Sequence, residues 1–195
     1  MHRVATISRV LRATTVAVVA TVLLTAGAVP AAVPQAGAVA PYCGITWGSL
    51  PRTGSRLVAG PIINARAGQH PCYDRLVVDL RSAPAPGFNV RYVTRVGTQG
   101  SGRVVPLRGG AFLQIVVRAP TYDTAGHTTY QPARPSEAVA VTGFRTFRQV
   151  AYAGSFEGYT SFGLGVRARL PFRVFTLAGP GSRTRLVIDV AHRWS

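Results

Sequence analysis

Lysine is absent from this chain: all 22 basic residues are arginine, against only 6 acidic residues in a total of 195. Without lysine, the phosphate-binding loop G-x-x-x-x-G-K-[ST] is excluded. Two cysteines are too few for a disulfide-dense mini-protein or a four-thiolate zinc site. Charged residues are scarce, at 14%, whereas hydrophobic residues reach 47% and occur in short runs. This composition excludes wholesale disorder and favours a folded domain with its own core.

The N-terminus has the composition of a secretory signal peptide. Several arginines and no acidic residue precede an uncharged, largely apolar run over residues 13–29. Small residues follow, and residues 36–38 match the small-x-small pattern that signal peptidase cleaves. We therefore expect residues 1–38 to be removed after Ala38, with 26–28 as a second candidate site. An uncleaved membrane anchor is the alternative, because the run approaches the roughly 20 residues needed to span a bilayer. Threonines within the run favour secretion, with no stable membrane span after cleavage.

The two cysteines are expected to form a disulfide bond, because export places the chain in an oxidising compartment. A bond between Cys43 and Cys72 closes a loop of about 29 residues and stabilises the fold by about 3 to 4 kcal/mol in the loop-entropy model. Two free, buried thiols are the alternative. We expect residues 39–55 to form an N-terminal segment tethered by this bond, and residues 56–195 to form a single domain.

Beyond residue 42 the sequence predicts a domain that is nearly all β. Short β-branched and aromatic runs recur between Gly, Pro, Asp and Ser, and helical periodicity is missing. The one long connection, Pro120–Ser136, is predicted to be a functional loop or a mobile insertion. The predicted strands are Arg56–Ala67, Tyr73–Arg81, Asn89–Val96, Ala111–Arg118, Phe144–Gly154, Thr160–Val166, Phe172–Leu177 and Thr184–Ala191.

Two segments, residues 75–80 and 185–190, share the pattern Arg-Leu-Val-aliphatic-Asp-aliphatic. The alternation of a strand places their aliphatic side chains on a core face and their Arg and Asp side chains on the opposite face. We therefore interpret Asp79 and Asp189 as partners in cross-strand ion pairs, and a catalytic role for these carboxylates is the alternative. The two segments are expected at related positions in the sheets.

A set of runs, mostly in the C-terminal half of the chain, resembles a known family. The runs are Ala153–Gly158, Thr160–Val166, Pro171–Leu177 and Arg185–Val190, with Tyr73–Leu80 and Gly87–Val93 upstream. Together they resemble the AMIN-like domain of secreted actinobacterial proteins over residues 56–192. The related AMIN domain is a non-catalytic β-sandwich, found beside amidase and secretin modules and thought to hold them at the cell wall. The resemblance therefore implies an all-β fold, a small β-sandwich of antiparallel strands, with no catalytic residues. Because the chain stops at Ser195, we expect no catalytic or pore-forming neighbour on it.

The chain is predicted not to be an enzyme, because no catalytic, metal-binding or cofactor-binding pattern is recognisable. In the run 154–158, Ser155 lies one position too early for the nucleophile elbow G-x-S-x-G. His70, His127 and His192 are too far apart for a compact metal motif and are interpreted as surface or loop residues. A small secreted enzyme is the least favoured function, and only a pocket that holds a nucleophile and a base would revive it.

Arginine and aromatic residues supply the remaining functional signal. The mature chain carries a net charge of about +13, which attracts polyanions whatever the fold. Export argues against nucleic acid, so the expected partner is an anionic cell-wall polymer or peptidoglycan. Guanidinium groups would bind its acidic groups and aromatic rings would stack on its sugars. The competing interpretation places most of the aromatic residues in the core and leaves the arginines as a solvated face. The candidate ligand-binding residues are Arg145, Arg148, Phe156, Tyr159, Arg167, Arg169 and Arg173.

The sequence thus favours a non-catalytic, secreted binding module of the cell envelope that uses no cofactor. The alternative is a secreted interaction module that docks to another exported protein. In that case the contact would be formed by the connection Pro120–Ser136 and by strands at the sheet edges.

Overall fold

The computed structural model describes residues 40–54, 60–81 and 85–194, which belong to the compact unit Ala38–Ser195. The predicted signal peptide, residues 1–38, lies outside the described residues. The elements are η1 (Tyr42–Gly44), β1 (Arg52–Gly54), β2 (Ile62–Gln69), β3 (Tyr73–Leu80), β4 (Phe88–Val93), β5 (Val96–Gly97), β6 (Val104–Val105), β7 (Ala111–Val117), η2 (Pro135–Glu137), β8 (Phe147–Phe156), β9 (Tyr159–Val166), β10 (Phe172–Ala178) and β11 (Thr184–Ala191). Each predicted strand overlaps one of these, and the short strands β1, β5 and β6 are additional.

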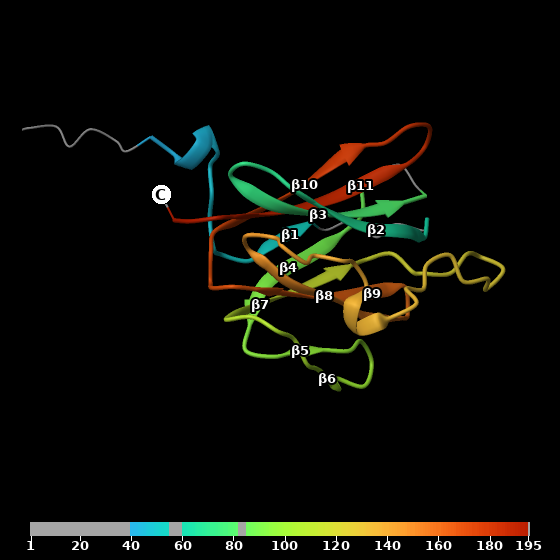
Figure 1. Cartoon of the computed structure of the whole chain (residues 1–195). Helices are drawn as coiled ribbons and strands as arrows, with labels where there is room; N and C mark the ends of the chain where they lie inside the picture. Colours follow the sequence, from blue (N-terminus) through green and yellow to red (C-terminus); the bar gives the residue numbers. More distant parts are fainter. Residues whose placement is uncertain (1–39, 55–59, 82–84, 195) are drawn as a thin grey trace, which may run out of the picture. The chain divides into compact units, whose positions relative to one another are not determined.

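The strands form two antiparallel sheets that pack as a β-sandwich (Figure 1). One sheet has five strands in the order β1-β4-β7-β9-β8, and the other has four in the order β10-β11-β3-β2. Strands β5 and β6 form a separate hairpin. The predicted all-β class and the antiparallel sandwich are confirmed. Within the described ranges, no helix has the length and apolar character needed to cross a membrane.

The two segments that share a sequence pattern lie side by side at the centre of the four-stranded sheet. They are β3 and β11, which pair antiparallel with Leu76 opposite Ile188 and Val78 opposite Leu186. All four side chains are 0% exposed, as the alternation predicts. Fully burying an aliphatic side chain of this size stabilises a fold by about 1.5 to 3 kcal/mol. The repeated pattern therefore marks the two inner strands of one sheet.

The core lies between the sheets and its largest side chains are phenylalanines. Phe147 of β8, Phe162 of β9 and Phe172 of β10 are each at most 1% exposed. They belong to one apolar cluster, in which aliphatic side chains from both sheets meet. Tyr152 and Phe144 are half-buried against the same cluster. For these aromatic residues, packing in the core is the observed role.

Alternating glycines in β9 allow a third layer to cover the five-stranded sheet. A β-carbon on Gly165 would lie 2.0 Å from the carbonyl oxygen of Arg108, and one on Gly163 would lie 2.8 Å from a methyl group of Leu107. The Gln99 amide also donates to the Ser161 hydroxyl at 2.8 Å. Only glycine therefore permits the segment 94–110, which includes the β5-β6 hairpin, to lie directly on this outer face.

The β8-β9 hairpin is tighter than the sequence suggests. We expected β8 to end at Gly154, but the strand continues to Phe156 and leaves a two-residue turn. Both turn residues have positive φ, 49° at Glu157 and 78° at Gly158, as a two-residue hairpin turn requires. Phe156 and Tyr159 on either side are 50% and 37% exposed, as expected.

The N-terminal segment is fastened to the four-stranded sheet by the predicted disulfide. Cys43 and Cys72 are bonded, with their Cα atoms 6.5 Å apart. Further along the segment, the Gly48 carbonyl accepts a hydrogen bond from the Phe172 amide at 2.6 Å. The Trp47 ring lies 5.9 Å from the ring of Tyr73. The bond thus holds an aromatic side chain on the outer face of the sheet.

Candidate functional site

The long connection between β7 and β8 is fixed against the sandwich by side-chain hydrogen bonds. Thr129 donates from its hydroxyl to the carbonyl oxygen of Ile62 at 2.7 Å. The hydroxyls of Thr121 and Tyr152 lie 3.0 Å apart. Later in the connection, the Ala138 amide donates to the carbonyl oxygen of Val150, which lies on the edge strand β8, at 2.8 Å. These contacts favour the interpretation of the connection as a functional loop.

A groove runs between this connection and the edge strands β2 and β8. Its larger part is a cavity of 630 Å³, and its smaller part is a hollow of 490 Å³ that shares Arg108 and Glu137 with the cavity. Both volumes fall within the range of ligand-binding pockets. Three arginines and one glutamate carry the charge of the lining. The groove is lined by, among others, Ala65, Arg108, Tyr130, Arg134, Glu137, Val141, Arg148 and Tyr152.

Arg108 and Glu137 form an ion pair between the two parts of the groove. The Arg108 guanidinium also donates to the carbonyl oxygen of Arg148 at 3.1 Å, and the Arg108 amide donates to Gln149 at 2.7 Å. The hydrogen bond to Glu137 is the main reason that the pKa of Arg108 is raised above its usual value. Because Arg108 is 62% exposed, this pair contributes more to the position of the side chains than to stability.

The other two arginines differ in how firmly they are held. One nitrogen of Arg148, Nη1, donates to the carbonyl oxygens of Phe144, Arg145 and Phe147 at 2.9 to 3.3 Å. This places the Arg148 guanidinium at the start of β8 and leaves its other nitrogens for a ligand. Arg134 is exposed and makes no side-chain hydrogen bond or ion pair to any described residue. It is therefore a cation that is available to an anionic ligand.

Tyr130 supplies the aromatic floor of the larger cavity. Its ring packs edge-on against Tyr152, 5.7 Å between centroids, and 6.0 Å from the ring of Phe162. Its hydroxyl is buried and has no hydrogen-bond partner in the described part of the chain. Burial, followed by the neighbouring Tyr152, raises the pKa of Tyr130 to about 12. At neutral pH the Tyr130 hydroxyl is therefore uncharged.

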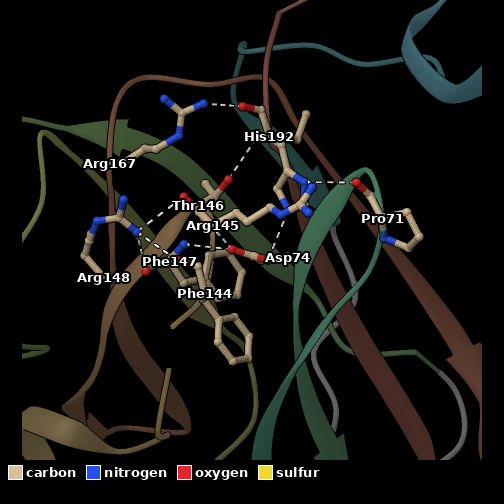
Figure 2. A network of polar contacts seen from close by, with 10 residues as sticks. Pro71, Asp74, Phe144, Arg145, Thr146, Phe147, Arg148, Arg167 and His192 are labelled. Atoms are coloured by element: carbon tan, nitrogen blue, oxygen red, sulfur yellow. Dashed lines mark hydrogen bonds and ion pairs between the residues drawn. The ribbon is translucent and has the colours of Figure 1, made fainter. Parts of the chain in front are cut away.

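The structure brings together three of the arginines predicted to bind ligand. Arg145, Arg148 and Arg167 lie at the beginning of β8, where Figure 2 shows them around the same turn. The Arg167 amide donates to the Thr146 carbonyl at 2.9 Å, and its guanidinium donates to the carbonyl oxygen of His192. Arg145 is exposed, and its side chain has no ion-pair partner among the residues described. Of these three, Arg148 lines the groove.

The remaining predicted residues lie elsewhere. Phe156 and Tyr159 are at the other end of the β8-β9 hairpin, about 30 Å from the start of β8 at the rise of a strand. The Arg169 guanidinium lies 4.8 Å from the ring centroid of Tyr92. Arg173 is on the outer face of the four-stranded sheet, in an ion pair with Asp189 at 2.8 Å. The predicted set therefore does not form a single surface.

Figure 2 also shows a buried polar network that the sequence did not predict. The carboxylate of Asp74, 0% exposed, accepts hydrogen bonds from the amides of Thr146 at 2.6 Å and Phe147 at 3.0 Å. Its second oxygen lies 3.1 Å from Nε2 of His192, whose Nδ1 lies 3.2 Å from the carbonyl oxygen of Pro71. Of the two interpretations of His192, as a surface or a loop residue, the first is wrong: His192 follows the end of β11 but is only 8% exposed, because the chain there passes over the start of β8. This network joins strands from both sheets.

Metal chemistry receives no support from the described side chains. No group of three or more His, Cys, Asp or Glu in that part of the chain is arranged to hold a metal ion. The predicted cross-strand ion pairs are present: Asp79 pairs with Arg66 at 2.9 Å and Asp189 pairs with Arg75 at 2.7 Å. These carboxylates thus have the structural role expected from the sequence.

Sequence reasoning missed most of the groove. Tyr130 and Arg134 lie inside the connection that was singled out for its length, so length was the available signal. Arg108 and Glu137 had no local signal, because their proximity depends on two loops that are far apart in the sequence. Arg148 was predicted, but from its place in a run of arginines and not from a cavity.

A comparison with protein families agrees with this fold. The model of the AMIN-like domain matches residues 60–192, which span all the strands from β2 to β11. No curated protein and no solved structure matches the chain. The family match covers more than half of the chain and includes both sheets, the covering segment 94–110 and the groove. On this evidence the chain belongs to the AMIN-like domain family.

Proposed function

We propose that this domain is a secreted, non-catalytic binding module that holds an anionic polymer of the cell wall in the groove beside β8. Membership of the AMIN-like family points to a binding role related to the cell wall. The observation that carries the finer proposal is the groove itself, in which three arginines meet a single glutamate above a tyrosine floor.

The groove suits a polymer that carries repeated acidic groups. Guanidinium groups bind carboxylates and phosphates through several parallel donors. Arg134 and the outer nitrogens of Arg148 would take one acidic group, and the exposed Arg145 nearby would take another. Tyr130 would meet the face or a hydroxyl of a sugar unit between them. Overall charge also favours this partner, since the formal net charge of the whole chain is +16 and about +13 remains once residues 1–38 are removed.

A non-catalytic role is proposed because most of the acidic side chains, and His192, already have structural partners. Asp74 binds backbone amides and His192, and Asp189 binds two arginines. Asp123 and His127 lie together in a turn at the surface. A general base needs a free position beside the reacting group. None of these groups lines the groove.

Replacing both Arg134 and Arg148 with glutamine should weaken sedimentation with purified cell wall at low salt by about tenfold or more, because two charge-assisted contacts are lost. The measurement is the bound fraction as a function of wall concentration. Binding by the unchanged protein should also fall steeply between low salt and 0.5 M NaCl, since exposed charges are screened over about 8 Å at physiological ionic strength.

The matched control replaces Arg91 and Arg103 with glutamine. Both arginines are exposed and lie outside the groove. Because each variant loses two arginines, the control variant and the groove variant have the same net charge. If the two variants lose binding equally, attraction is due to overall charge and the groove is not the site. Arg173 is unsuitable for this test, although the sequence predicted it, because it neutralises the buried Asp189.

Export is the second part of the proposal. The bonded pair Cys43 and Cys72 points to an extracellular or envelope location. We expect mass spectrometry of protein from the culture medium to find Val39 at the N-terminus, because residues 36–38 match the cleavage pattern. Recovery of intact protein that begins at Met1 in a membrane fraction would contradict this expectation.

Docking to another exported protein is the alternative function, and one observation favours it. At the tip of the long connection, Tyr122 is 40% exposed on a turn that Asp123 holds rigid. The Asp123 carboxylate accepts from the amides of Ala125 at 3.0 Å and His127 at 2.9 Å. These hydrogen bonds, that from His127 first, lower the pKa of Asp123. If the groove variant binds the wall as well as the unchanged protein does, docking to another exported protein becomes the preferred function.

A further inference from the structure

The outer face of the four-stranded sheet carries ordered rows of side chains, one row for each step along the strands. In one row, Arg173 of β10, Asp189 of β11 and Arg75 of β3 are direct cross-strand neighbours. Two residues further along each strand, Val187 lies opposite Val77. The next row places Arg185 of β11 opposite Asp79. The face thus has two charged rows on either side of a middle row, which consists of Phe175, Val187, Val77 and Arg66.

The first row is held rigid by a shared carboxylate. Asp189 is 0% exposed and accepts from Arg75 at 2.7 and 2.9 Å and from Arg173 at 2.8 Å. The Arg173 guanidinium lies 4.9 Å from the ring centroid of Phe175 and 5.5 Å from that of Trp47. Two positive charges are thus fixed beside one negative charge, and aromatic rings limit their movement.

A hollow of 230 Å³ lies next to this row, over the middle row of the same face. Val77 and Val187 form its floor, and both are at most 5% exposed. Arg75 and Arg185 line it from the two charged rows. At Gly68 on β2, which also lines the hollow, a β-carbon would meet no atom within 4 Å. Arg66 also lines the hollow from β2, and the hollow therefore has an apolar floor, three arginines around it and an open position at Gly68.

The hydrogen bonding of Arg185 indicates that the hollow binds a ligand. One of its nitrogens, Nη2, donates to the carbonyl oxygen of Ala178 at 2.6 Å. Its Nε is buried and has no hydrogen-bond partner among the described residues. Buried donors of charged groups are rarely left unpaired, because desolvation is then not offset by any hydrogen bond. Asp79, its neighbour across the strands, is already bound to Arg66 at 2.9 and 3.1 Å.

Charge and size together define what the hollow would accept. Four arginines, Arg66, Arg75, Arg173 and Arg185, face two aspartates, Asp79 and Asp189, across this sheet. This surplus of positive charge would attract an anionic ligand. The volume is smaller than the roughly 300 Å³ at which pockets for drug-sized ligands begin. An apolar group next to the anionic group of the ligand could pack on the two valines of the floor.

We propose that this hollow binds a single carboxylate attached to a small apolar residue, as found at the C-terminus of a peptide. One carboxylate oxygen accepts from the guanidinium of Arg185, whose side chain turns to present Nε to it, and the guanidinium of Arg75 attracts the other oxygen. The small side chain next to the carboxylate packs on Val77 and Val187. This site lies on the outer face of the four-stranded sheet, and the groove touches that sheet only at its edge strand β2, so the site does not depend on the polymer that the groove holds.

The test titrates the isotope-labelled exported protein with three probes and follows its backbone amides by NMR. The probes are N-acetyl-alanyl-alanine, the same dipeptide with a C-terminal amide, and inorganic phosphate. We expect saturable shifts at Gly68, Val77 and Val187 with the free acid only. Equal effects of the acid and its amide, or no effect of either, would overturn the proposal. Binding of phosphate without the dipeptide would also overturn it, because the apolar floor would then have no role.

Two variants test the site by different means. Arg185→Gln removes the buried donor and the charge, and Gly68→Val fills the open side while it leaves every charge in place. Both should weaken binding of the dipeptide by about tenfold or more. Gly68 is not in the left-handed region, and valine is favoured in strands, so the second variant keeps the fold.

The control variant is Arg183→Gln, which removes an exposed arginine two positions away and outside the hollow. Its affinity for the dipeptide should equal that of the unchanged protein. Loss of affinity in the control but not in Gly68→Val would overturn the proposal in favour of general charge attraction. Because no wall polymer is present in the titration, this outcome is independent of the function proposed for the groove.

Discussion

Replacing Asp74 with alanine is expected to lower the free energy of unfolding by about 4 kcal/mol, since two buried amides and a histidine lose their shared acceptor. Thr146 and Phe147 are at most 1% exposed, so their amides lie inside the fold and away from bulk solvent. His192 loses the oxygen 3.1 Å from its ring. Urea denaturation followed by circular dichroism measures the difference.

The control for this prediction is Asp79→Ala. Asp79 lies on the same strand and also forms an ion pair, but its side chain is 17% exposed and that of its partner Arg66 is 50% exposed. An exposed pair contributes about 0.2 to 1 kcal/mol. Equal losses in the two variants would show that the buried network does not join the sheets in the way we describe.

Removal of the disulfide, by replacing Cys43 and Cys72 with alanine, should cost about 3 to 4 kcal/mol, because the unfolded chain regains the entropy of an open loop. The sequence separation of the two cysteines is 29 residues. The loss appears as a lower denaturation midpoint, and reduction of the unchanged protein should produce a similar shift.

Tryptophan fluorescence distinguishes unfolding of the whole domain from local release of the N-terminal segment that the disulfide holds. Trp47 follows Cys43 closely, and its indole nitrogen donates to the carbonyl oxygen of Tyr42 at 2.9 Å. When the bond is broken, we expect emission from Trp47 to shift towards that of exposed tryptophan before the domain unfolds. A Trp194→Phe background removes the other tryptophan, which is already 53% exposed. A single, simultaneous transition would contradict local release of the segment.

The strands could be predicted because their pattern is local. Alternation in residues 75–80 and 185–190 is enough to identify buried and outward faces, and both faces are as expected. Family resemblance supplied the sandwich, which alternation alone does not distinguish from a barrel. The end of β8 was misplaced, because Gly154 resembles a turn residue but lies at an irregularity within the strand.

The candidate site could be predicted only in part, because its geometry depends on contacts between distant segments. Arg108 meets Glu137 only after the segment 94–110 has packed on the glycines of β9. Similarly, the sequence places Arg173 among the ligand-binding arginines, but it does not show that a buried carboxylate occupies that side chain. Which arginines are free is a property of the folded chain.

The pairing of β3 with β11 has a consequence for the order in which this protein folds. Arg75 and Asp189 are separated by 114 residues, and they belong to the two inner strands of one sheet. Domains dominated by such distant pairings fold in milliseconds to seconds, because a long loop must close before its contacts form. As the chain is synthesised, strands β2 and β3 therefore emerge long before β11, and the edge of β3 that pairs with β11 stays open in the meantime. The hairpin of β8 and β9 pairs locally and needs no distant partner, and it supplies a surface on which β2 and β3 can pack.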